Sequence, residues 1–372
     1  MKTKIIFLIP NLKHGGAEKV LVNLVNNLDQ NRYDVTIQTL FDVGVNKKYI
    51  EPHVHYRSFW KKEFRGNSYI FKMFSPSFWW KKIVKEQYDV AISYLEGPTA
   101  RILSGCNDSH TKKVSWIHIE LPTEKLAAQG FKSVQEAKDA YESFDKVIAV
   151  SKTVKECFEN SLKIKNKVEV LYNTNETEQI IKKSKESIND VNFIDDDVLS
   201  VCSVAKLMKT KGYDRLIEVH KRLIKEGIEH RVYILGIGEE QTYLESKIKE
   251  YGLEKNFILL GFHDNPYKYV KRCDLYVCSS RREGFSTAVT EALVVGTPVV
   301  STNCSGAKEL LGDHNEYGIV VENNTEGIYD GMKKMLTNSQ ILQHYKEQAI
   351  LRGERFSKER TVKAVEDMIE KL

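Results

Sequence analysis

The sequence predicts an α/β protein with two doubly wound domains, and three observations support that fold class. Short β-branched runs alternate with longer helical stretches along the 372 residues. Most of these runs are apolar at consecutive positions, as is typical of parallel strands that helices cover on both faces. The alternation stops once, in a polar stretch at residues 174–197, and then resumes. Because a chain of this length can bury two separate cores, we expect one domain on each side of that stretch.

The first domain is expected over residues 1–173. Its candidate strands are short and rich in β-branched or aromatic residues, and they lie at residues 4–10, 34–40, 89–94, 113–118, 146–151 and 168–172. A helix is expected at residues 17–28. The turn before this helix contains Gly15 and Gly16, which would let a ligand approach the backbone closely. A plain tight turn is the alternative interpretation.

The polar and charged residues 174–197 indicate an interdomain connection with one short amphipathic helix. The second domain is expected over residues 198–354. Its candidate strands again share consecutive apolar residues and lie at residues 198–204, 232–235, 257–260, 275–278, 298–301 and 318–321. Helices are expected at residues 212–225 and 242–250. A final helix, at about residues 355–372, could pack back on the first domain or stay with the second.

Ligands of doubly wound sheets bind beyond the carboxyl ends of the strands. We therefore expect the two domains to face each other across a cleft that holds the ligand. His118 stands at the end of a candidate strand in the first domain. A histidine there is either a hydrogen-bonded core residue or a group that points into the cleft.

The most informative segment runs from Glu283 to Glu291 and reads EGFSTAVTE. It follows a buried apolar strand and contains the start of a predicted helix. A helix start offers unpaired N–H groups and the positive end of the helix dipole, which favour a phosphate. Carboxylates repel a phosphate but accept hydrogen bonds from sugar hydroxyls. Two acids beside a phosphate site therefore indicate a sugar nucleotide, which carries hydroxyls on both sides of its diphosphate.

Lys206 and Lys211 lie on the loop that follows the first strand of the second domain. Lysines at the carboxyl end of a strand can neutralise a diphosphate as point charges, although most lysine-rich loops are simply solvated. The phosphate interpretation is favoured because the same sheet edge also supplies Glu283 and its neighbours. By contrast, the acids at residues 195–197 have the D-x-D spacing of some metal-dependent enzymes but precede their strand, so we interpret them as a solvated turn.

Residues 57–85 carry eight basic side chains, a single acid and many aromatic residues. The side chains expected to form a membrane or acceptor face are Trp60, Lys61, Lys62, Trp79, Trp80, Lys81 and Lys82. Basic charge interleaved with aromatics is typical of proteins that bind an anionic membrane surface. It also occurs in proteins that bind single-stranded nucleic acid, and an ordinary helical lid with solvated lysines is a third interpretation. We favour the membrane and expect no nucleic-acid partner.

The composition, with 41% hydrophobic and 29% charged residues, is typical of a globular protein. The six cysteines are scattered and form no C-x-x-C pair, so we expect buried thiols in a reducing compartment and no zinc site. The apolar run at residues 5–9 is too short for a signal sequence, and no run reaches the length of a membrane span. We therefore expect a cytoplasmic protein that is at most peripheral on the membrane.

Taken together, these motifs resemble those of glycosyltransferase family 4, a large group of retaining enzymes with the GT-B fold. The most specific is Glu283-x7-Glu291 within SSRREGFS, followed by GTPVV at residues 296–300. The GGAE turn at residues 15–18, the strand at residues 145–151, Asn173 and the Lys211-Gly212 pair are also similar to family elements. The resemblance extends over nearly the whole chain.

In the second domain, the resemblance implies two carboxylate contacts with the donor. Glu283 would contact the donor sugar near the reacting centre, and Glu291 would accept hydrogen bonds from the ribose hydroxyls. The diphosphate would be held by Lys211 and by the main chain of a short segment, comprising Gly284, Phe285, Ser286 and Thr287.

In the first domain, the resemblance implies that His118 touches the donor sugar and that Gly16, next to Gly15, lies under the phosphates. His118, Glu283 and Lys211 would be the catalytic residues. Many relatives have arginine where this chain has Lys206. Lysine keeps the positive charge but loses the bidentate fork of arginine, which changes how phosphate could be bound there.

The reaction expected from the resemblance is transfer of a sugar from a nucleoside diphosphate, with UDP the first choice, to a hydroxyl of a saccharide or lipid-linked saccharide. Bacterial surface-polysaccharide biosynthesis is the expected context. Because the family generally works without a bound metal, we expect neither a metal nor another cofactor. The alternatives are a sugar-nucleotide epimerase or hydrolase with the same fold, and a non-catalytic subunit that binds a sugar nucleotide.

Overall fold

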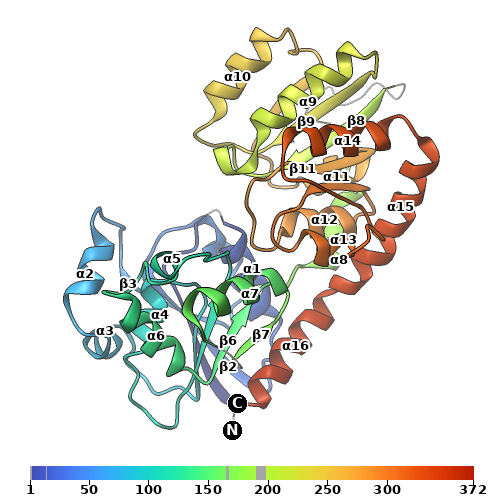
Figure 1. The fold of residues 1–372 in the computed structure, drawn as a ribbon. Helices are drawn as coiled ribbons and strands as arrows, with labels where there is room; N and C mark the ends of the chain where they lie inside the picture. Colours follow the sequence, from blue (N-terminus) through green and yellow to red (C-terminus); the bar gives the residue numbers. More distant parts are fainter. Residues whose placement is uncertain (1, 14, 165–166, 190–197) are drawn as a thin grey trace. The chain divides into compact units, whose positions relative to one another are not determined.

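A computed structural model of the chain describes residues 2–13, 15–164, 167–189 and 198–372. The chain forms two compact units (Figure 1). The first runs to Asn175 and also contains Glu359–Leu372, and the second is Glu176–Lys358. The acidic turn predicted at residues 195–197, like the last part of the predicted connection from residue 190 on, lies outside the described residues.

The first unit is built on a seven-stranded parallel sheet. Its strands are β1 (Thr3–Ile9), β2 (Tyr33–Phe41), β3 (His55–Trp60), β4 (Val90–Ser93), β5 (Lys112–Ile117), β6 (Lys146–Ala149) and β7 (Val168–Val170). Their order across the sheet is β3-β2-β1-β4-β5-β6-β7, so the direction of winding reverses between β1 and β4. This reversal is the mark of a doubly wound sheet.

Helices of the first unit connect these strands (Figure 1). They are α1 (Gly16–Asn27), the 3₁₀ turn η1 (Val45–Tyr49), α2 (Asn67–Met73), α3 (Pro76–Ile83), α4 (Pro98–Leu103), α5 (Glu124–Ala127), α6 (Val134–Glu142) and α7 (Lys152–Leu162). Four of them begin with a Ser or Thr side chain that accepts a main-chain N–H of the first turn, at Ser75, Thr123, Ser133 and Ser151. Such caps satisfy one of the N–H groups that a helix start leaves unpaired.

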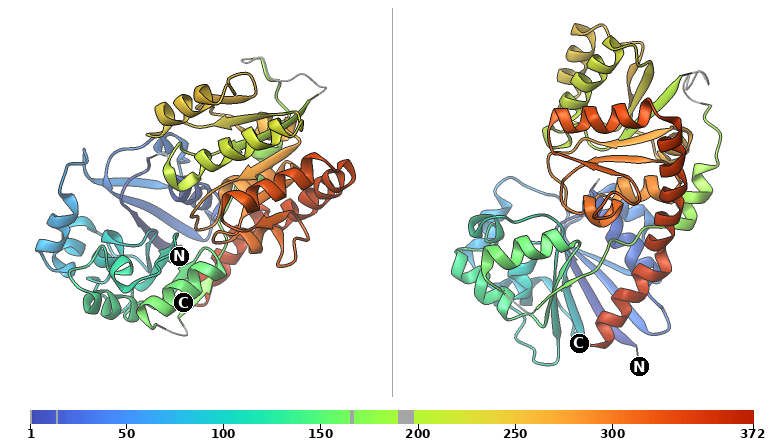
Figure 2. Two further views of the ribbon diagram at one scale, coloured as in Figure 1. Left: turned by 45° about the horizontal axis from the view of Figure 1, so that its top comes forward. Right: turned by 45° about the vertical axis from the view of Figure 1, so that its right-hand side comes forward.

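The last helix of the chain, α16 (Lys358–Glu370), lies with the first unit. Arg32 pairs with Glu366 at 3.5 Å and also with Glu370. The N–H of Asp29 donates to Glu366 Oε1 across 2.9 Å. Both ends of the chain therefore belong to one unit, and they lie close together in each view of Figure 2.

The second unit contains a six-stranded parallel sheet with the same winding. Its strands are β8 (Leu199–Val204), β9 (His230–Leu235), β10 (Phe257–Gly261), β11 (Leu275–Cys278), β12 (Val299–Thr302) and β13 (Ile319–Val321). Across the sheet the order is β10-β9-β8-β11-β12-β13, which reverses between β8 and β11. The predicted α/β class with two doubly wound sheets is confirmed.

The helices of the second unit alternate with these strands. They are α8 (Thr177–Ser184), η2 (Lys209–Lys211), α9 (Tyr213–Lys225), α10 (Gln241–Glu250), α11 (Tyr267–Arg272), α12 (Thr287–Val294), α13 (Ala307–Leu311), α14 (Thr325–Leu336), α15 (Ser339–Gly353) and η3 (Glu354–Phe356). Helix α8 falls within the predicted connection, and Asn265 Nδ2 donates to its Lys183 carbonyl across 3.0 Å. This helix is therefore part of the second unit.

All twelve strands predicted from apolar runs are present, and their ends shift by at most two residues. Strand β3 was not predicted. It lies at the edge of its sheet, and its residues are exposed or half-buried throughout. An edge strand of this kind lacks the continuous apolar run on which the other predictions depended.

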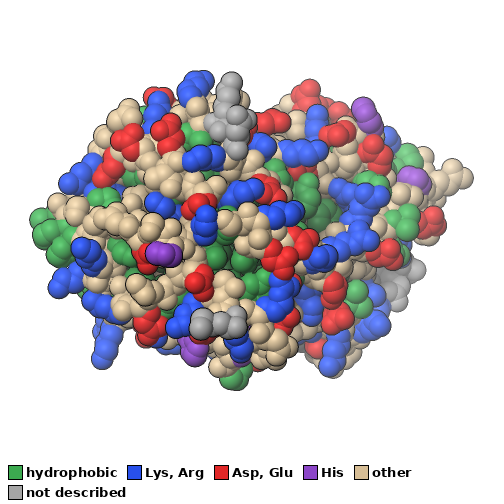
Figure 3. All heavy atoms as spheres, turned by 90° about the horizontal axis from the view of Figure 1, so that it is seen from below, with side chains coloured by type: hydrophobic (Ala, Val, Ile, Leu, Met, Phe, Trp, Pro, Cys, Tyr) green, Lys and Arg blue, Asp and Glu red, His purple; other side chains and the backbone are tan. Residues whose placement is uncertain are grey.

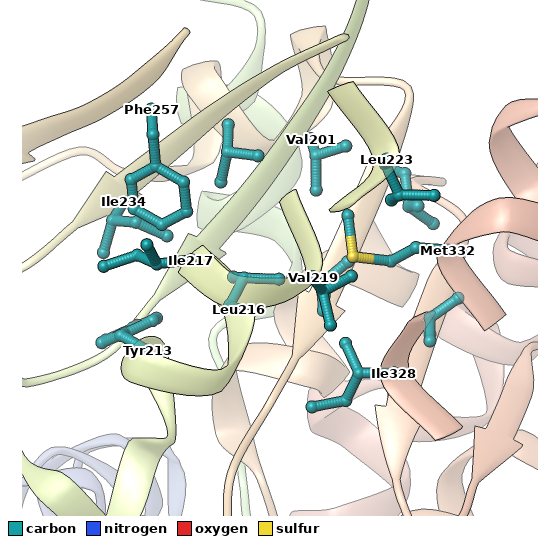
Figure 4. Packing of buried hydrophobic residues seen from close by; sticks show 14 of the residues in the cluster. Val201, Tyr213, Leu216, Ile217, Val219, Leu223, Ile234, Phe257, Ile328 and Met332 are labelled. Carbon is teal, nitrogen blue, oxygen red and sulfur yellow. The ribbon is translucent and has the colours of Figure 1, made fainter. Parts of the chain in front are cut away.

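One face of the second sheet is covered by α9 and α14 (Figure 4). Leu216 and Leu223 of α9 and Met332 of α14 are fully buried in a single cluster with Val201 of β8. Leu216 and Leu223 lie two turns apart on the same side of α9, so the helix presents one apolar stripe to the sheet. Removing each such side chain from water contributes about 2 kcal/mol to the free energy of folding.

None of the helices in the described parts of the chain combines the length and the apolar character that crossing a membrane requires.

Two histidines lie buried between α9 and β9. His220 Nδ1 and His230 Nε2 are 2.8 Å apart, and the outer nitrogens lie 3.0 Å from Asn256 Oδ1 and 2.8 Å from the Ile228 carbonyl. Burial, and next the neighbouring His230, lower the pKa of His220 to about 3. Burial also lowers the pKa of His230. Burial therefore favours the neutral form of each ring.

This pair predicts that the second unit loses stability in mild acid. An unfolded histidine binds a proton below about pH 6.5, whereas His220 in the folded protein does not until about pH 3. The free energy of unfolding should therefore fall as the pH drops from 6.5 towards 3, by about 2 kcal/mol at pH 5 from His220 alone. Denaturant unfolding at pH 7 and pH 5 measures this difference.

The variant His220→Gln should show a smaller difference in stability between the two pH values. The variant His110→Gln is the control, because the side chain of His110 is 94% exposed. An unchanged pH dependence in His220→Gln would contradict the prediction.

Candidate functional site

The two sheets each have a point where the strand order reverses, between β1 and β4 and between β8 and β11. Loops that leave the carboxyl ends of two such strands run in opposite directions and leave a crevice, where ligands of α/β sheets bind. In the second unit these loops follow β8 and β11. They supply Lys206, Lys211, Glu283 and Ser286, four residues predicted from the sequence to bind the donor.

Lys211 and Glu283 contact each other at this point. Lys211 Nζ and Ser280 Oγ each donate to Glu283 Oε1 across 2.6 Å. The side chains of Lys211 and Glu283 are 23% and 13% exposed. Burial works to lower the pKa of Lys211, but the charge of Glu283 and the hydrogen bond to it outweigh this effect, and the pKa of Lys211 is raised. Lys211 is therefore a protonated and largely buried cation at neutral pH.

The start of α12 lies just beyond Glu283. Ser286 is its N-cap residue, and the Ser286 hydroxyl accepts the N–H of Val289 at 3.4 Å. The first turn, which begins at Thr287, contains no acidic residue. The positive end of the helix dipole is thus not neutralised from within the helix, which favours an anionic ligand.

Gly284 and Phe285 join Glu283 to this helix. The Phe285 side chain is buried against Phe356, with ring centroids 5.9 Å apart, so only its main chain could serve a ligand. A Cβ on Gly306 would lie 3.2 Å from the Gly284 carbonyl oxygen and 2.9 Å from the Phe285 ring. Close packing against Gly306 therefore fixes this segment.

Glu291 lies further along α12, and the residue is 8% exposed. The Tyr267 hydroxyl donates to Glu291 Oε1 across 3.3 Å.

Lys206 differs from the other predicted residues, because its side chain is exposed and has no ion pair in the described parts of the chain. The structure thus brings Lys211 and Glu283 into contact, and it leaves Lys206 as a solvated charge on the same loop.

An arginine that the sequence did not single out joins the two loops. Arg281 donates to both carboxylate oxygens of Asp214, across 2.7 and 2.6 Å. The Arg281 guanidinium also donates to the Lys209 carbonyl across 2.8 Å, and the main-chain N–H of Arg281 donates to the Thr210 carbonyl across 2.7 Å. A bidentate arginine–carboxylate pair has a fixed geometry, so Arg281 sets the position of the loop that carries Lys211.

Gly212 and Arg215 also hold the loop after β8 against the loop after β11. Gly212 has φ +71°, and a Cβ there would lie 2.1 Å from the Ser279 carbonyl oxygen. Arg215 donates to that oxygen across 2.6 Å, while Ser279 Oγ donates to the Lys211 carbonyl across 2.8 Å. The loop after β8 is therefore in direct backbone contact with the loop after β11.

In the first unit, His118 follows β5 and is 8% exposed. Burial lowers the pKa of His118 to about 3, so the ring is neutral at pH 7. Its Nε2 has no hydrogen-bond partner within the described residues. Its main-chain N–H donates to Glu96 Oε2 across 3.0 Å. Glu96 was not predicted, because nothing in the sequence shows that the ends of β4 and β5 are adjacent.

Gly15 is the N-cap residue of α1 and Gly16 is the first residue of that helix. Gly15 has φ −151°, an extended conformation open to any residue. A Cβ on Gly15 would lie 1.9 Å from Glu18 Oε2, the end of a flexible side chain that can move away, so glycine is not required here. The Glu18 carboxylate thus lies at the same helix start that the sequence assigned to phosphate.

All six cysteines are free. Two of them, Cys278 at the end of β11 and Cys304 after β12, influence each other, and the neighbouring Cys304 lowers the pKa of the Cys278 thiol. Within the described residues, no group of three His, Cys, Asp or Glu side chains could hold a metal ion.

The structure corrects part of the predicted membrane or acceptor face. Trp79 is 4% exposed, and its ring lies 5.1 Å from Phe71 and 5.9 Å from Trp60. Trp79 is therefore a core residue, because it shares the inward face of α3 with Ile83. Trp60 is half-buried in the same cluster and stacks on Phe41 at 5.5 Å.

The rest of that segment does present a surface. Trp80 is half-buried, whereas the lysines are exposed, namely Lys61, Lys62, Lys81 and Lys82. Large apolar side chains that the sequence did not distinguish are also exposed, with 77% for Tyr69, 67% for Met73, 45% for Phe74 and 37% for Phe78. We call these four residues the aromatic edge.

The buried Arg101 hydrogen-bonds the main chain that carries part of the aromatic edge. It is 1% exposed and donates to the Phe74 carbonyl across 3.1 Å and to Glu136 across 2.8 Å.

Outside this segment, positive and negative side chains are mixed on the protein surface. Lys and Arg are interspersed with Asp and Glu on the face shown in Figure 3, and the net charge of the chain is only +5.

Two family models match the chain. The model described as Glycosyltransferase Family 4 matches residues 14–179, and the one described as Glycosyl transferases group 1 matches residues 184–352. The chain belongs to glycosyltransferase family 4, group 1. The family predicted from the sequence motifs is confirmed.

Relatives of this glycosyltransferase include characterised and uncharacterised enzymes. It is 37% identical over 208 residues to the N-acetylgalactosamine-N,N'-diacetylbacillosaminyl-diphospho-undecaprenol 4-alpha-N-acetylgalactosaminyltransferase of Campylobacter jejuni, a match that covers 55% of this chain and 53% of the relative. It is 24% identical over 369 residues to an uncharacterized glycosyltransferase of Haemophilus influenzae, covering 96% and 98%. The first match thus spans about half of the relative's length.

Solved structures of this fold include Anabaena HepE in complex with UDP and glucose. The TM-score is 0.77 over the full length of both chains, at 20% identity. TarM of S. aureus in complex with UDP gives a TM-score of 0.73 at 16% identity, covering 98% of each chain. These likenesses confirm the GT-B fold of this glycosyltransferase.

We expect Lys211→Ala to lower turnover at saturating donor at least tenfold. Removing one charged donor aimed at a leaving group costs about 3 kcal/mol, or roughly a hundredfold in rate. Initial rates at saturating donor measure the effect. The variant Lys209→Ala is the control, because Lys209 is an exposed lysine of the same loop. Near-normal turnover in a folded Lys211→Ala protein would remove Lys211 from the site.

Proposed function

We propose that this glycosyltransferase moves a sugar from UDP to a hydroxyl of a saccharide or lipid-linked saccharide, with retention of the anomeric configuration. The observation that carries the proposal is the contact between Lys211 and Glu283 at the reversal of strand order, next to the start of α12. It places a cation, a carboxylate and a helix start within two neighbouring loops. A sugar nucleotide needs all three, because its diphosphate is anionic and its sugar carries hydroxyls.

In the proposed reaction, the bond between the sugar and the diphosphate breaks, and negative charge grows on the phosphate oxygens. Lys211 and the N–H groups at the start of α12 would stabilise that charge more in the transition state than in the ground state. The raised pKa of Lys211 keeps it protonated for this role. The departing phosphate would take the proton of the acceptor hydroxyl on the same face of the sugar, and no enzyme nucleophile is then needed.

Glu283 would accept hydrogen bonds from the donor sugar. When a diphosphate draws Lys211 towards itself, Glu283 keeps its hydrogen bond from Ser280 and therefore stays in position. Glu291 would accept from the ribose hydroxyls, with Tyr267 orienting its carboxylate. The UDP bound to HepE and TarM supports this choice of donor nucleotide.

In the first unit, His118 would touch the donor sugar and Gly16 would lie under the phosphates. The lipid-linked acceptor is suggested by the Campylobacter jejuni relative, whose name specifies a diphospho-undecaprenol acceptor. Colanic acid glycosyltransferases among the relatives suggest polysaccharide biosynthesis as the context. We place the enzyme in the cytoplasm, with the aromatic edge and its exposed lysines against the membrane.

We further propose that no metal ion is required. The positive charge that a divalent cation would bring to a diphosphate comes here from Lys211, from Lys206 and from the α12 helix start. The negative diphosphate would attract the exposed Lys206 side chain, which would then act as a point charge beside it.

The proposal predicts that UDP-sugars raise the melting temperature of the protein and that at least one of them is a donor. A ligand that binds only the folded state stabilises it according to its concentration. A panel of nucleotide sugars identifies the donor, and product analysis with and without acceptor separates transfer from hydrolysis or epimerisation. Activity should survive EDTA; complete loss that manganese restores would contradict the metal-free part, and sugar release without transfer would contradict the reaction.

We also predict that the protein binds vesicles containing anionic lipid at low salt. Apolar side chains that enter the interface and lysines that attract the headgroups both contribute. Co-sedimentation should fall strongly in Met73→Ser/Phe74→Ser. The variant Tyr243→Ser removes a 46% exposed aromatic from the second unit and is the control. Equal binding by both variants, or none by the wild type, would refute the membrane face.

A further inference from the structure

An open cavity of about 660 Å³ lies at the β7 edge of the first sheet. Its lining residues come from β6, from helix α7 and from residues 167–172, and all of them belong to the first unit. The volume is typical of small-molecule sites, which measure about 300–1,000 Å³. We call it the β7 cavity. Its charged lining has an excess of two positive charges and consists of Lys146, Lys152, Lys155, Lys167, Glu156 and Glu169.

Two of the four lysines already have partners, but only one of them is neutralised. Lys146 Nζ and Glu169 Oε2 lie 2.9 Å apart and form an ion pair. The ammonium of Lys167 instead donates to main-chain carbonyls, those of Glu142 and Phe144, the latter across 3.1 Å. A carbonyl satisfies an N–H group but carries no net charge, so the positive charge of Lys167 stays in the cavity.

Lys155 is the cation most available to a ligand. It is half-buried, and its ammonium has no hydrogen bond or ion pair within the parts of the chain that the structure describes. Lys152 and Lys155 both lie near the start of α7, whose first turn contains no acidic residue. The positive end of the helix dipole therefore adds to the charge of these lysines. A partly buried charge without a partner is unfavourable, and a bound oxyanion would remove that cost.

The rest of the lining suits a saccharide better than a bare anion. Glu156 is exposed and has no hydrogen bond or ion pair among the described residues. Its carboxylate would repel a second oxyanion but would accept a hydrogen bond from a hydroxyl. Val168, Val170 and Tyr172 add apolar surface on which the C–H groups of a sugar ring can pack. A saccharide that carries a phosphate or carboxylate group combines all three properties.

The β7 cavity belongs to the same sheet as His118. In the strand order, β6 and β7 follow β5, the strand that ends just before His118. Neighbouring strands are about 4.8 Å apart, so β7 lies about 10 Å from β5. This separation is within the reach of an oligosaccharide that also extends to the end of β5.

We infer that the acceptor of this enzyme is an anionic saccharide and that the β7 cavity binds its phosphate or carboxylate group. The charged group would lie on a different sugar residue from the hydroxyl that receives the transferred sugar. The inference rests on the proposed function, because it takes the ligand to be the acceptor. Phosphate and carboxylate share the chemistry that lysines recognise, and the test distinguishes them.

Equilibrium binding tests the cavity without a known acceptor. The probes are glucose 6-phosphate, glucuronate and neutral glucose, titrated against the whole protein by ligand-observed NMR with saturating UDP present to occupy the donor site. At least one anionic probe should bind at least tenfold more tightly than glucose, and that probe identifies the oxyanion. Lys155→Ala should weaken its binding at least fivefold, because a charged hydrogen bond is lost. Lys155→Arg should retain binding, because it restores the charge.

The matched control is Lys125→Ala, which removes an exposed lysine of the same unit that does not line the β7 cavity. This variant should bind the anionic probe as the wild type does. Equal binding of glucose and both anionic probes would overturn the inference. An equal loss of binding in Lys125→Ala and Lys155→Ala, or no loss in Lys155→Ala, would also overturn it.

Acceptor kinetics separate this inference from the proposed function. Lys155→Ala should raise the KM for the acceptor at least tenfold and change the KM for the donor much less. With an acceptor analogue that lacks the oxyanion, wild type and Lys155→Ala should have the same KM, because the partner of Lys155 is already absent. An unchanged acceptor KM in Lys155→Ala would overturn the inference and leave the transfer reaction standing. Absence of any transfer by the wild type would instead overturn the proposed function, and with it the assignment of this cavity to the acceptor.

Discussion

Parallel strand pairing is the constraint on which both candidate sites depend. Because every strand of a parallel sheet runs the same way, all carboxyl ends meet at one edge, and residues far apart in sequence become neighbours there. Glu96 and His118 follow adjacent strands of the first sheet, while Lys211 and Glu283 follow adjacent strands of the second. The residues proposed to act on the substrates, His118, Lys211 and Glu283, thus lie on short loops whose ends the sheets hold in place.

Holding the ends of a loop does not fix its middle, and the two units solve this problem in similar ways. In the second unit, Gly212 packs against the Ser279 carbonyl, and Arg281 bridges to Asp214. In the first, Gly97 and Gly130 are in backbone contact. Each arrangement fixes the backbone beside a charged side chain, Lys211 in the second unit and Glu96 in the first.

Much of the fold could be predicted from the sequence, because buried parallel strands leave continuous apolar runs such as residues 5–9 and 275–278. The Glu283–Glu291 motif was found for a similar reason, since its residues are local to one strand, turn and helix. Arg281–Asp214 and Glu96–His118 are pairings over 67 and 22 residues, and they depend on strand order, which periodicity does not encode. Trp79 was misplaced because composition does not tell which face of a short helix turns inward.

The glycine contact between residues 97 and 130 bears on any attempt to redesign this enzyme. Since even a methyl group at Gly130 would overlap the Gly97 backbone, neither loop can be randomised or lengthened there without separating the two. Mutant libraries designed to change the sugar preference should therefore vary neighbouring side chains and keep Gly97 and Gly130 unchanged. The same contact implies that distant homologues with bulkier residues at both positions must route these loops differently.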